Sequence, residues 1–285
     1  MRWQQLVKKS DEVLCEVRST RVFYTKSAIK IYDEMLEEKR NSIRSRLIKM
    51  YKKANAGHVG CSLSCLEIMV FVKFELMKAD DEIILSKGHA AALLYSVLAE
   101  AGIISEKEIE SFYQNGTYLS AHPPVNKIKG IPFATGSLGH GLSIAAGLGL
   151  ANKLKKSDKK IFCITSDGEL NEGSTWEAAL FIAHHNLKNV VWLIDRNYLQ
   201  GFGRTEETIK LDPLDKKIES FGFQVAVADG HNFDSLGKAV AEFGNEKPLA
   251  IICNTVKGKL LALENTVDCH YLPLTEEDFQ KLIIQ

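Results

Sequence analysis

The stretch IFCITSDGELNEG, residues 161–173, decides the fold, because it joins a short apolar run directly to a polar, glycine-containing turn. The run IFCIT has the length and the β-branched content of a buried strand. The segment STWEAALFIAHH (174–185) that follows the turn is predicted to be a helix. A second apolar run, NVVWLID (189–195), comes next and predicts another strand. Strand, turn, helix and strand in this order predict two parallel neighbours in one sheet.

The same alternation extends along the chain. Further strands are expected over residues 81–86, 223–228 and 248–254, and further helices over residues 27–54, 62–78, 89–101 and 232–244. We therefore predict an α/β fold, a mostly parallel sheet with helices on both faces. In such sheets ligands bind just beyond the carboxyl ends of the strands.

Two oxygen-bearing side chains stand at predicted strand ends. Asp167 follows the strand 161–165, and Asn197 follows the strand 189–195. A carboxylate and an amide oxygen suit Mg²⁺ or Ca²⁺ and suit zinc poorly. Gly168 would let the backbone approach a phosphate closely. The alternative is a solvated turn, which is built from the same residue types.

Composition excludes several classes of partner. The 285 residues include 36 basic and 36 acidic side chains, so net charge predicts neither nucleic acid nor a membrane surface as partner. There is no apolar run of bilayer length and no secretory signal near the N-terminus, and we expect a cytoplasmic protein. Six cysteines form no CxxC pair. Zinc binding by Cys61 and Cys65, four residues apart, is an alternative to core packing.

Several motifs together resemble one family. The segment SDGELNEG, the predicted helix and DRNYLQ (195–200) resemble the thiamine diphosphate motif of transketolases, with Ser166 in place of its first glycine. Four more segments agree in order: NAGHVGCSLSCLEI (55–68), LSKGHAAALLYSVLAEAG (85–102), TGSLGHGLSIAAGLGLA (135–151) and VKGKLLALENTVDCHY (256–271). The resemblance covers residues 40–280. It implies the diphosphate-binding domain of the thiamine diphosphate-binding fold over residues 27–285, preceded by a peripheral extension over residues 1–26.

The resemblance implies a metal and a cofactor. Asp167, the side chain of Asn197 and the carbonyl of Leu199 would hold Mg²⁺, for which Ca²⁺ is an alternative, and the metal would bridge the diphosphate of thiamine diphosphate. Gly168 would donate its amide to that diphosphate. Asn197 therefore counts among both the metal and the cofactor residues.

The resemblance also assigns four histidines. His89 and His270 would lie near the diphosphate and the thiazolium, whereas His58 and His122 would face the sugar and move protons. No role follows for three other histidines, which are expected to be surface or packing residues: His184, His185 and His231.

Three further positions come from the same motifs. Leu138 would pack on the cofactor, and Gly136 belongs to the same glycine-rich segment, which could instead be simply the start of a helix. Glu172 would sit where subunits of the family share buried carboxylates across an interface. Glu169 is expected to be solvated.

The family pattern implies a missing half. The resemblance is to the N-terminal domain alone, so no residue here takes the role of the glutamate that activates the aminopyrimidine. We expect an enzyme subunit completed by a second chain carrying the pyrimidine-binding domain, the catalytic glutamate and the C-terminal domain, in an α2β2 assembly. With that partner it would transfer a two-carbon ketol unit from a ketose to an aldose.

Substrate and rival functions stay open at this level. Cys269 where the family usually has tryptophan, and the turn GFGRTEE (201–207), are departures near the expected site. They favour a specialised sugar or sugar-nucleotide pathway and ordinary pentose phosphates equally. The alternatives are a subunit of another thiamine enzyme, of the dehydrogenase or deoxyxylulose-phosphate synthase type, and a non-catalytic binding half.

Overall fold

The computed structural model describes the backbone of residues 26–241 and 246–284. The predicted extension over residues 1–26 lies outside this part of the chain, except for its last residue. The described residues include no helix that combines the length and the apolar character needed to cross a membrane.

Five parallel strands form one sheet in the order β1-β2-β3-β5-β4. Their bounds are β1 Glu82–Leu85, β2 Ile161–Ser166, β3 Val190–Arg196, β4 Gln224–Asp229 and β5 Leu249–Asn254. Every strand predicted from the apolar runs is present within a residue or two of its expected ends. Because all strands point the same way, their carboxyl ends meet at one edge, where the polar turns after β2 and β3 lie next to each other.

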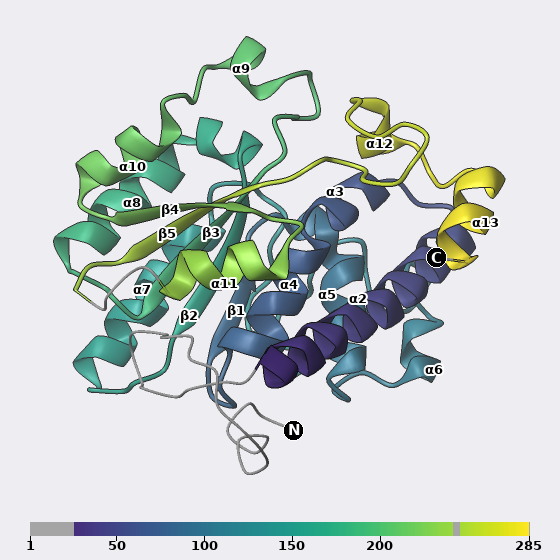
Figure 1. Ribbon diagram of the computed structural model, residues 1–285, viewed down its shortest axis with the longest axis horizontal. Coiled ribbons are helices and arrows are strands. Elements are labelled where there is room, and N and C mark those ends of the chain that lie inside the picture. The colour runs from purple at the N-terminus through teal and green to yellow at the C-terminus, as the bar shows by residue number, and fades with distance from the viewer. Residues whose placement is uncertain (1–25, 242–245, 285) are drawn as a thin grey trace.

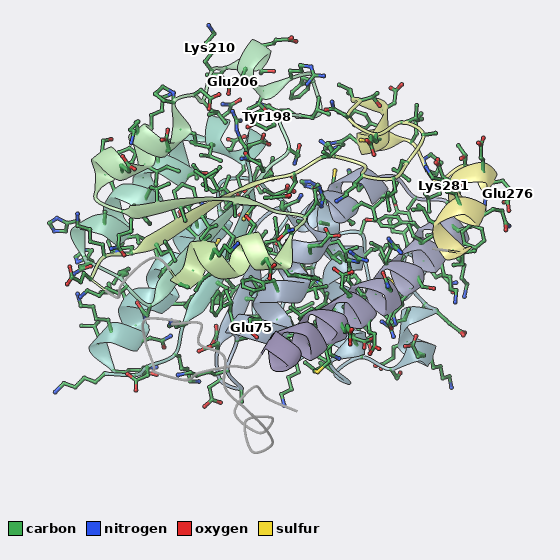
Figure 2. All side chains as sticks on the ribbon, in the orientation of Figure 1. Glu75, Tyr198, Glu206, Lys210, Glu276 and Lys281 are labelled. Carbon is green, nitrogen blue, oxygen red and sulfur yellow. The ribbon has the colours of Figure 1, made fainter. Side chains whose placement is uncertain are left out.

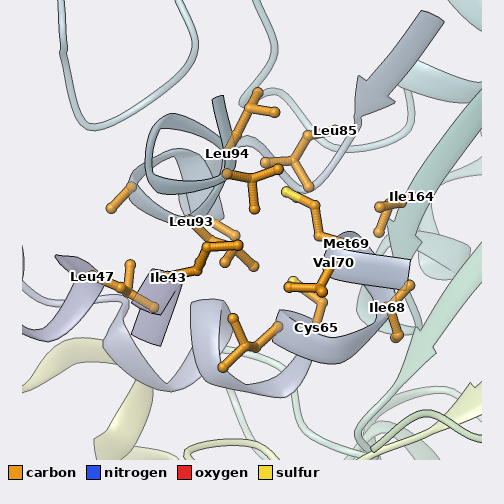
Figure 3. Close-up of a cluster of buried hydrophobic side chains, with 14 of the residues drawn as sticks. Ile43, Leu47, Cys65, Ile68, Met69, Val70, Leu85, Leu93, Leu94 and Ile164 are labelled. Carbon is orange, nitrogen blue, oxygen red and sulfur yellow. The ribbon is translucent and has the colours of Figure 1, made fainter. Parts of the chain in front are cut away.

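Helices cover both faces of the sheet, as predicted (Figure 1). One face packs on α2 Lys26–Ala54, α4 Leu66–Phe71, α5 Ala91–Glu100 and α11 Phe233–Ala241. The other packs on α7 Gly141–Leu154, α8 Gly173–His184 and α10 Leu214–Phe221. Figure 3 shows the first core, where Ile43 and Leu47 of α2 meet Leu93 of α5 and the strand residues Leu85 and Ile164.

The single helix expected over residues 62–78 is wrong in its continuity. The chain instead forms α3 Val59–Ser64, then α4, then a π-helical turn, η1 Val72–Leu76. Cys65, with φ −110° and ψ 18°, separates α3 from α4. His58 begins α3 in the left-handed conformation, with φ 71°. The break matters for the site, because it lets α3 carry His58 to the carboxyl edge of the sheet.

Short elements gather around that edge. They are η2 Gly88–Ala90, α6 Glu106–Ile109, η3 Gly168–Asn171, α9 Thr205–Thr208, α12 Asp268–Tyr271 and α13 Glu276–Ile284. In Figure 1, α9 and α12 stand beyond the ends of the strands, at the top of the view. Figure 2 shows Tyr198 and Glu206 at the same end. The carboxyl edge is thus walled by loops from several parts of the chain.

Candidate active site at the carboxyl edge of the sheet

A cavity of about 270 Å³ opens at the carboxyl edge of the sheet. Its walls come from the turns after β2 and β3, from η2 and from the segment that follows β5. Seven of its lining residues were predicted to bind cofactor or metal: His89, Leu138, Gly168, Glu172, Asn197, Leu199 and His270. Residues that the sequence reasoning did not single out also line it: Cys61, Lys87, Gln200 and Lys257 among them. Most of the predicted site is therefore brought together.

The four predicted histidines cluster, although each comes from a different segment. The ring centroid of His58 lies 5.6 Å from that of His89, 6.3 Å from that of His122 and 5.1 Å from that of His270. The rings of His89 and His270 are 5.5 Å apart. His122 is exposed and the other three are half-buried. The fold thus places four imidazoles around one point at the mouth of the site.

The surroundings of these histidines favour the neutral imidazole. Burial lowers the pKa of His58 and that of His122, and the charge of His122 lowers the pKa of His58 further. Burial, with the nearby Lys87 ammonium, lowers the pKa of His89 well below its usual value. Burial and the charge of Lys257 lower the pKa of His270 to about 3. Neutral rings can both accept and donate protons, which is the property that acid–base chemistry requires.

Lys257 is a residue of this site that the sequence reasoning missed. Its ammonium donates to Nδ1 of His270 at 2.8 Å and to the carbonyl of Leu199 at 3.2 Å. Because an ammonium can only donate, Nδ1 of His270 accepts, and the ring proton is on Nε2. The motif VKGK was noticed, but nothing in the sequence showed that its first lysine would point into the cavity.

Asp167 is buried at the end of β2, and its two carboxylate oxygens are in different surroundings. Oδ2 accepts from the amide of Tyr198 at 2.7 Å, from Thr205 Oγ1 at 3.2 Å and from the Arg196 guanidinium at 3.3 Å. Oδ1 accepts from the amide of Gly168 at 2.8 Å. Burial raises the pKa of Asp167 to about 6, and Arg196 opposes that rise.

These oxygens pass a test of fit for a hard cation. Asp167 offers a carboxylate, and Asn197 and Leu199 line the cavity with an amide oxygen and a carbonyl oxygen. Mg²⁺ binds few protein ligands of this kind and completes its shell with water or phosphate oxygens. In the structure two of these groups have internal partners, since Asn197 Oδ1 accepts from the amide of Leu199 at 3.2 Å and the Leu199 carbonyl accepts from Lys257.

Zinc does not fit. Across residues 26–241 and 246–284, no three carboxylate, imidazole or thiol side chains converge as metal ligands. Cys61 and Cys65 are buried free thiols. The sulfur of Cys61 lies 3.5 Å from Nδ1 of His270.

Arg196, also missed, ties the turn after β2 to the loop around α9. Its side chain is only 2% exposed and pairs with Asp167, with Glu206 at 2.5 Å and with Asp212 at 3.2 Å. The guanidinium also lies 4.3 Å from the centre of the Tyr198 ring. Sequence position alone could not reveal these partners, because Glu206 and Asp212 follow in an irregular segment.

A second buried ion pair lies beneath the cavity floor. Lys87 and Asp195 pair directly, with side chains 1% and 0% exposed. Lys87 also donates to the carbonyl of Cys61 at 2.9 Å, and Asp195 accepts from the hydroxyls of Ser64, at 2.5 Å, and Thr255. The pair therefore joins η2, α3, β3 and the segment after β5.

The expectation that Glu169 is solvated is wrong. Its carboxylate is buried and accepts from Ser86 Oγ and from the amide of Gly139 at 2.8 Å. Burial raises the pKa of Glu169 to about 7. The amide of Gly141 donates to Ser86 Oγ at 3.0 Å. This hydrogen bonding holds the segment 135–141 against the turn after β2, because the first amides of α7 find their acceptors there.

The remaining predicted residues lie as follows. A Cβ at Gly136 would come within 2.8 Å of the His122 ring, so this glycine allows close approach of His122. Glu172 is exposed at the cavity wall. His184 is exposed and His185 half-buried on or next to α8. His231 has a buried side chain that contacts Glu67, as expected of a packing histidine.

Comparison with known proteins gives a consistent result. Residues 36–285 match the family model described as transketolase, thiamine diphosphate binding domain. One of the two named subunits of the apulose-4-phosphate transketolase of Actinobacillus succinogenes is 40% identical over 238 residues, which are 80% of this chain and 86% of that protein. The 6-deoxy-6-sulfo-D-fructose transketolase subunit SqwG of a Clostridium species is 36% identical over 262 residues, which are 88% and 95% of the two chains.

Solved structures give the same picture. The crystal structure of transketolase from Campylobacter jejuni superposes with a TM-score of 0.81 at 30% identity. The match covers 87% of this chain and 42% of that one. The chain is thus similar in extent to relatives named as subunits, and to less than half of a longer transketolase.

Proposed function

This chain belongs to the transketolase family, and from that membership we propose that it is the diphosphate-binding subunit of a two-chain transketolase. With its partner it transfers a two-carbon ketol unit from a ketose donor to an aldose acceptor. The observation that carries the proposal is the meeting of four histidines with the turns bearing Asp167 and Asn197 at the carboxyl edge of the sheet. The alternative functions named from the sequence would not need all of these groups.

The cofactor of the family, thiamine diphosphate, fits the polar end of the cavity. We propose that Asp167, Asn197 and the Leu199 carbonyl hold Mg²⁺, with Ca²⁺ as a substitute. Gly168 and Lys257 would bind the diphosphate, for which an amide and an ammonium are suitable donors. Lys257 would then release the Leu199 carbonyl to the cation. When bound, the cofactor supplies the carbon nucleophile and the electron sink for cleaving the bond next to a ketose carbonyl.

The chain's own residues would orient the sugar and move protons. His58 and His122, at the open side of the cluster, would donate to sugar hydroxyls and take up the proton released on cleavage. His270 would present its Nε2 proton toward the cavity, since Lys257 occupies Nδ1. His89 would face the cofactor from below. Leu138 and Gly136 would form the apolar wall beside the cofactor rings.

We propose that a complementary subunit completes the site. The relatives named as transketolase subunits have nearly the same extent as this chain, which supports a separate second polypeptide. That second chain would carry the pyrimidine-binding domain and the glutamate that activates the aminopyrimidine. Glu172, exposed at the cavity wall, would face it, and two copies of each chain would assemble as α2β2.

The substrate class follows from the names of two relatives. One is named for apulose-4-phosphate and the other for 6-deoxy-6-sulfo-D-fructose. Both names describe a ketose with a strong acid group, a phosphate or a sulfonate. We propose that the donor here is also an acidic ketose from a specialised sugar pathway.

The test is reconstitution. This chain is tagged and purified gently from its native cells, the chain that co-purifies is identified, and the complex is assayed with thiamine diphosphate and Mg²⁺. Ketol transfer from phosphorylated or sulfonated ketoses by the complex, and by neither chain alone, is the expected result. Pyruvate turnover without ketol transfer would reassign the chain to another thiamine enzyme. A stable complex that binds no thiamine diphosphate would identify a non-catalytic half.

A preference for free pentose phosphates would overturn only the specialised donor. The donor series therefore includes xylulose 5-phosphate beside the sulfonated ketose, at equal concentrations. The role in a two-chain enzyme and the choice of donor can thus fail separately.

A further inference from the structure

His231 has both ring nitrogens bonded to groups from different elements. Nδ1 lies 2.9 Å from Oε2 of Glu67 in α4, and the amide of Val256 donates to Nε2 at 2.9 Å. The side chains of His231 and Glu67 are each only 7% exposed. His231 itself follows β4, and Val256 follows β5. One imidazole thus joins α4 to the ends of two strands.

The two bonds together determine the protonation of the ring. An amide N–H can only donate, so Nε2 of His231 must be the bare nitrogen. The proton is then on Nδ1 and is donated to the Glu67 carboxylate. This tautomer requires an acceptor on the α4 side, and Glu67 provides it. Glu67 therefore orients the ring, and the ring in turn bonds to the Val256 amide.

The bonded amide immediately precedes Lys257, the lysine that contacts His270 and the Leu199 carbonyl. Val256 lies beyond the last residue of β5, where the ladder of the sheet no longer holds the backbone. The segment on either side is tethered by Thr255, whose amide donates to the carbonyl of Arg196 at 3.0 Å, and by Gly258, whose amide donates to the carbonyl of Gly60 at 3.1 Å. The imidazole bond lies between these two tethers.

We propose that His231 is a positioning residue, which acts with Glu67 through the Val256 amide to direct the Lys257 ammonium into the cavity. The proposal rests on the proposed function, since it assigns to Lys257 the binding of an anionic cofactor group. His231 does not touch the cavity, and its expected role was packing alone. A packing role would require only the volume of the ring, whereas a positioning role requires an acceptor at Nε2.

Two substitutions separate these roles. In His231→Gln the amide oxygen can reach the place of Nε2 and accept from Val256, and in His231→Asn the shorter side chain reaches only the place of Nδ1. The complex of this chain with its partner is titrated with thiamine diphosphate at fixed Mg²⁺, and the dissociation constant is compared with kcat. We expect His231→Asn to weaken cofactor binding about 10- to 100-fold, the usual effect of removing a group that orients a ligand. His231→Gln should bind within about threefold of the unsubstituted complex, given the bond it retains.

Glu67 gives an independent pair of variants if the histidine variants do not fold, as judged by the thermal midpoint of each. Glu67→Gln keeps an acceptor for Nδ1–H and should bind cofactor normally, whereas Glu67→Ala should bind it more weakly. Equal binding by His231→Asn and His231→Gln, or by the two Glu67 variants, would overturn the positioning role. Failure of the unsubstituted complex to bind thiamine diphosphate would instead reject the proposed function.

Discussion

Two layers of the site differ in how their charges are held. The floor consists of paired, fully buried groups, Lys87 with Asp195 and Arg196 with Asp167. The mouth consists of four histidines whose surroundings favour the neutral form, three of them half-buried and one exposed. The floor joins elements of the fold to one another, whereas the mouth offers groups to a ligand.

The difference shows where the fold and the chemistry are separated. A buried charge is tolerated only when its partner and hydrogen bonds are in place, so the floor must be complete before any ligand binds. Neutral imidazoles carry a smaller desolvation cost and can stay partly unpaired. Substitutions in the floor should therefore act on folding, and substitutions at the mouth should act on turnover.

The largest expected effect is on the floor. Asp195→Asn removes the charge that compensates Lys87 and leaves a buried ammonium without its counter-ion. We expect the free energy of unfolding to fall by about 3–5 kcal/mol, as measured by denaturant unfolding. Lys216→Met is the control, because its ion pair with Glu219 is at the surface and should contribute nothing measurable. Equal stability of the two variants would contradict the assignment of a structural floor.

The next effect is at the mouth. His58→Ala should lower kcat of the reconstituted complex by roughly 100-fold, the scale of a lost acid–base group, with a much smaller change in stability. The matched control is His184→Ala, because that histidine is exposed on α8, away from the cluster. A loss of stability that fully explains the loss of rate would place His58 in the structural layer instead.

The sequence predicted the sheet well, because five apolar runs separated by helical segments have few alternatives. It also predicted the residues that line the cavity where these stand in recognisable motifs, such as His89 and Leu138. Their distances and roles beyond that stay predictions.

What the sequence could not predict are contacts across long separations. Lys87 and Asp195 are 108 residues apart, and Glu67 and His231 are 164 apart. Each of these residues has an ordinary surface explanation on its own, as Glu169 did. Pairing is a property of the assembled strand ends, and only the folded chain shows which charges are buried together.

The smallest expected effect concerns the pH dependence of stability. The pKa of His270 is lowered to about 3 in the folded chain by burial and by Lys257, against an ordinary value near 6.5. Below pH 6.5 the unfolded chain therefore binds a proton that the folded chain does not. This group's contribution to stability is fully present above pH 6.5 and is lost as the pH falls toward 3.

His270→Asn removes that titration. Between pH 7 and pH 5 the unsubstituted chain should lose about 1 kcal/mol more unfolding free energy than the variant, a value discounted because the ring is only half-buried. Urea unfolding at the two pH values measures the difference, and an unchanged m-value shows that the same surface unfolds. If the two stabilities fall in parallel, His270 is protonated in the folded chain. Lys257 would then not donate to Nδ1, and the neutral mouth would be reduced to three histidines.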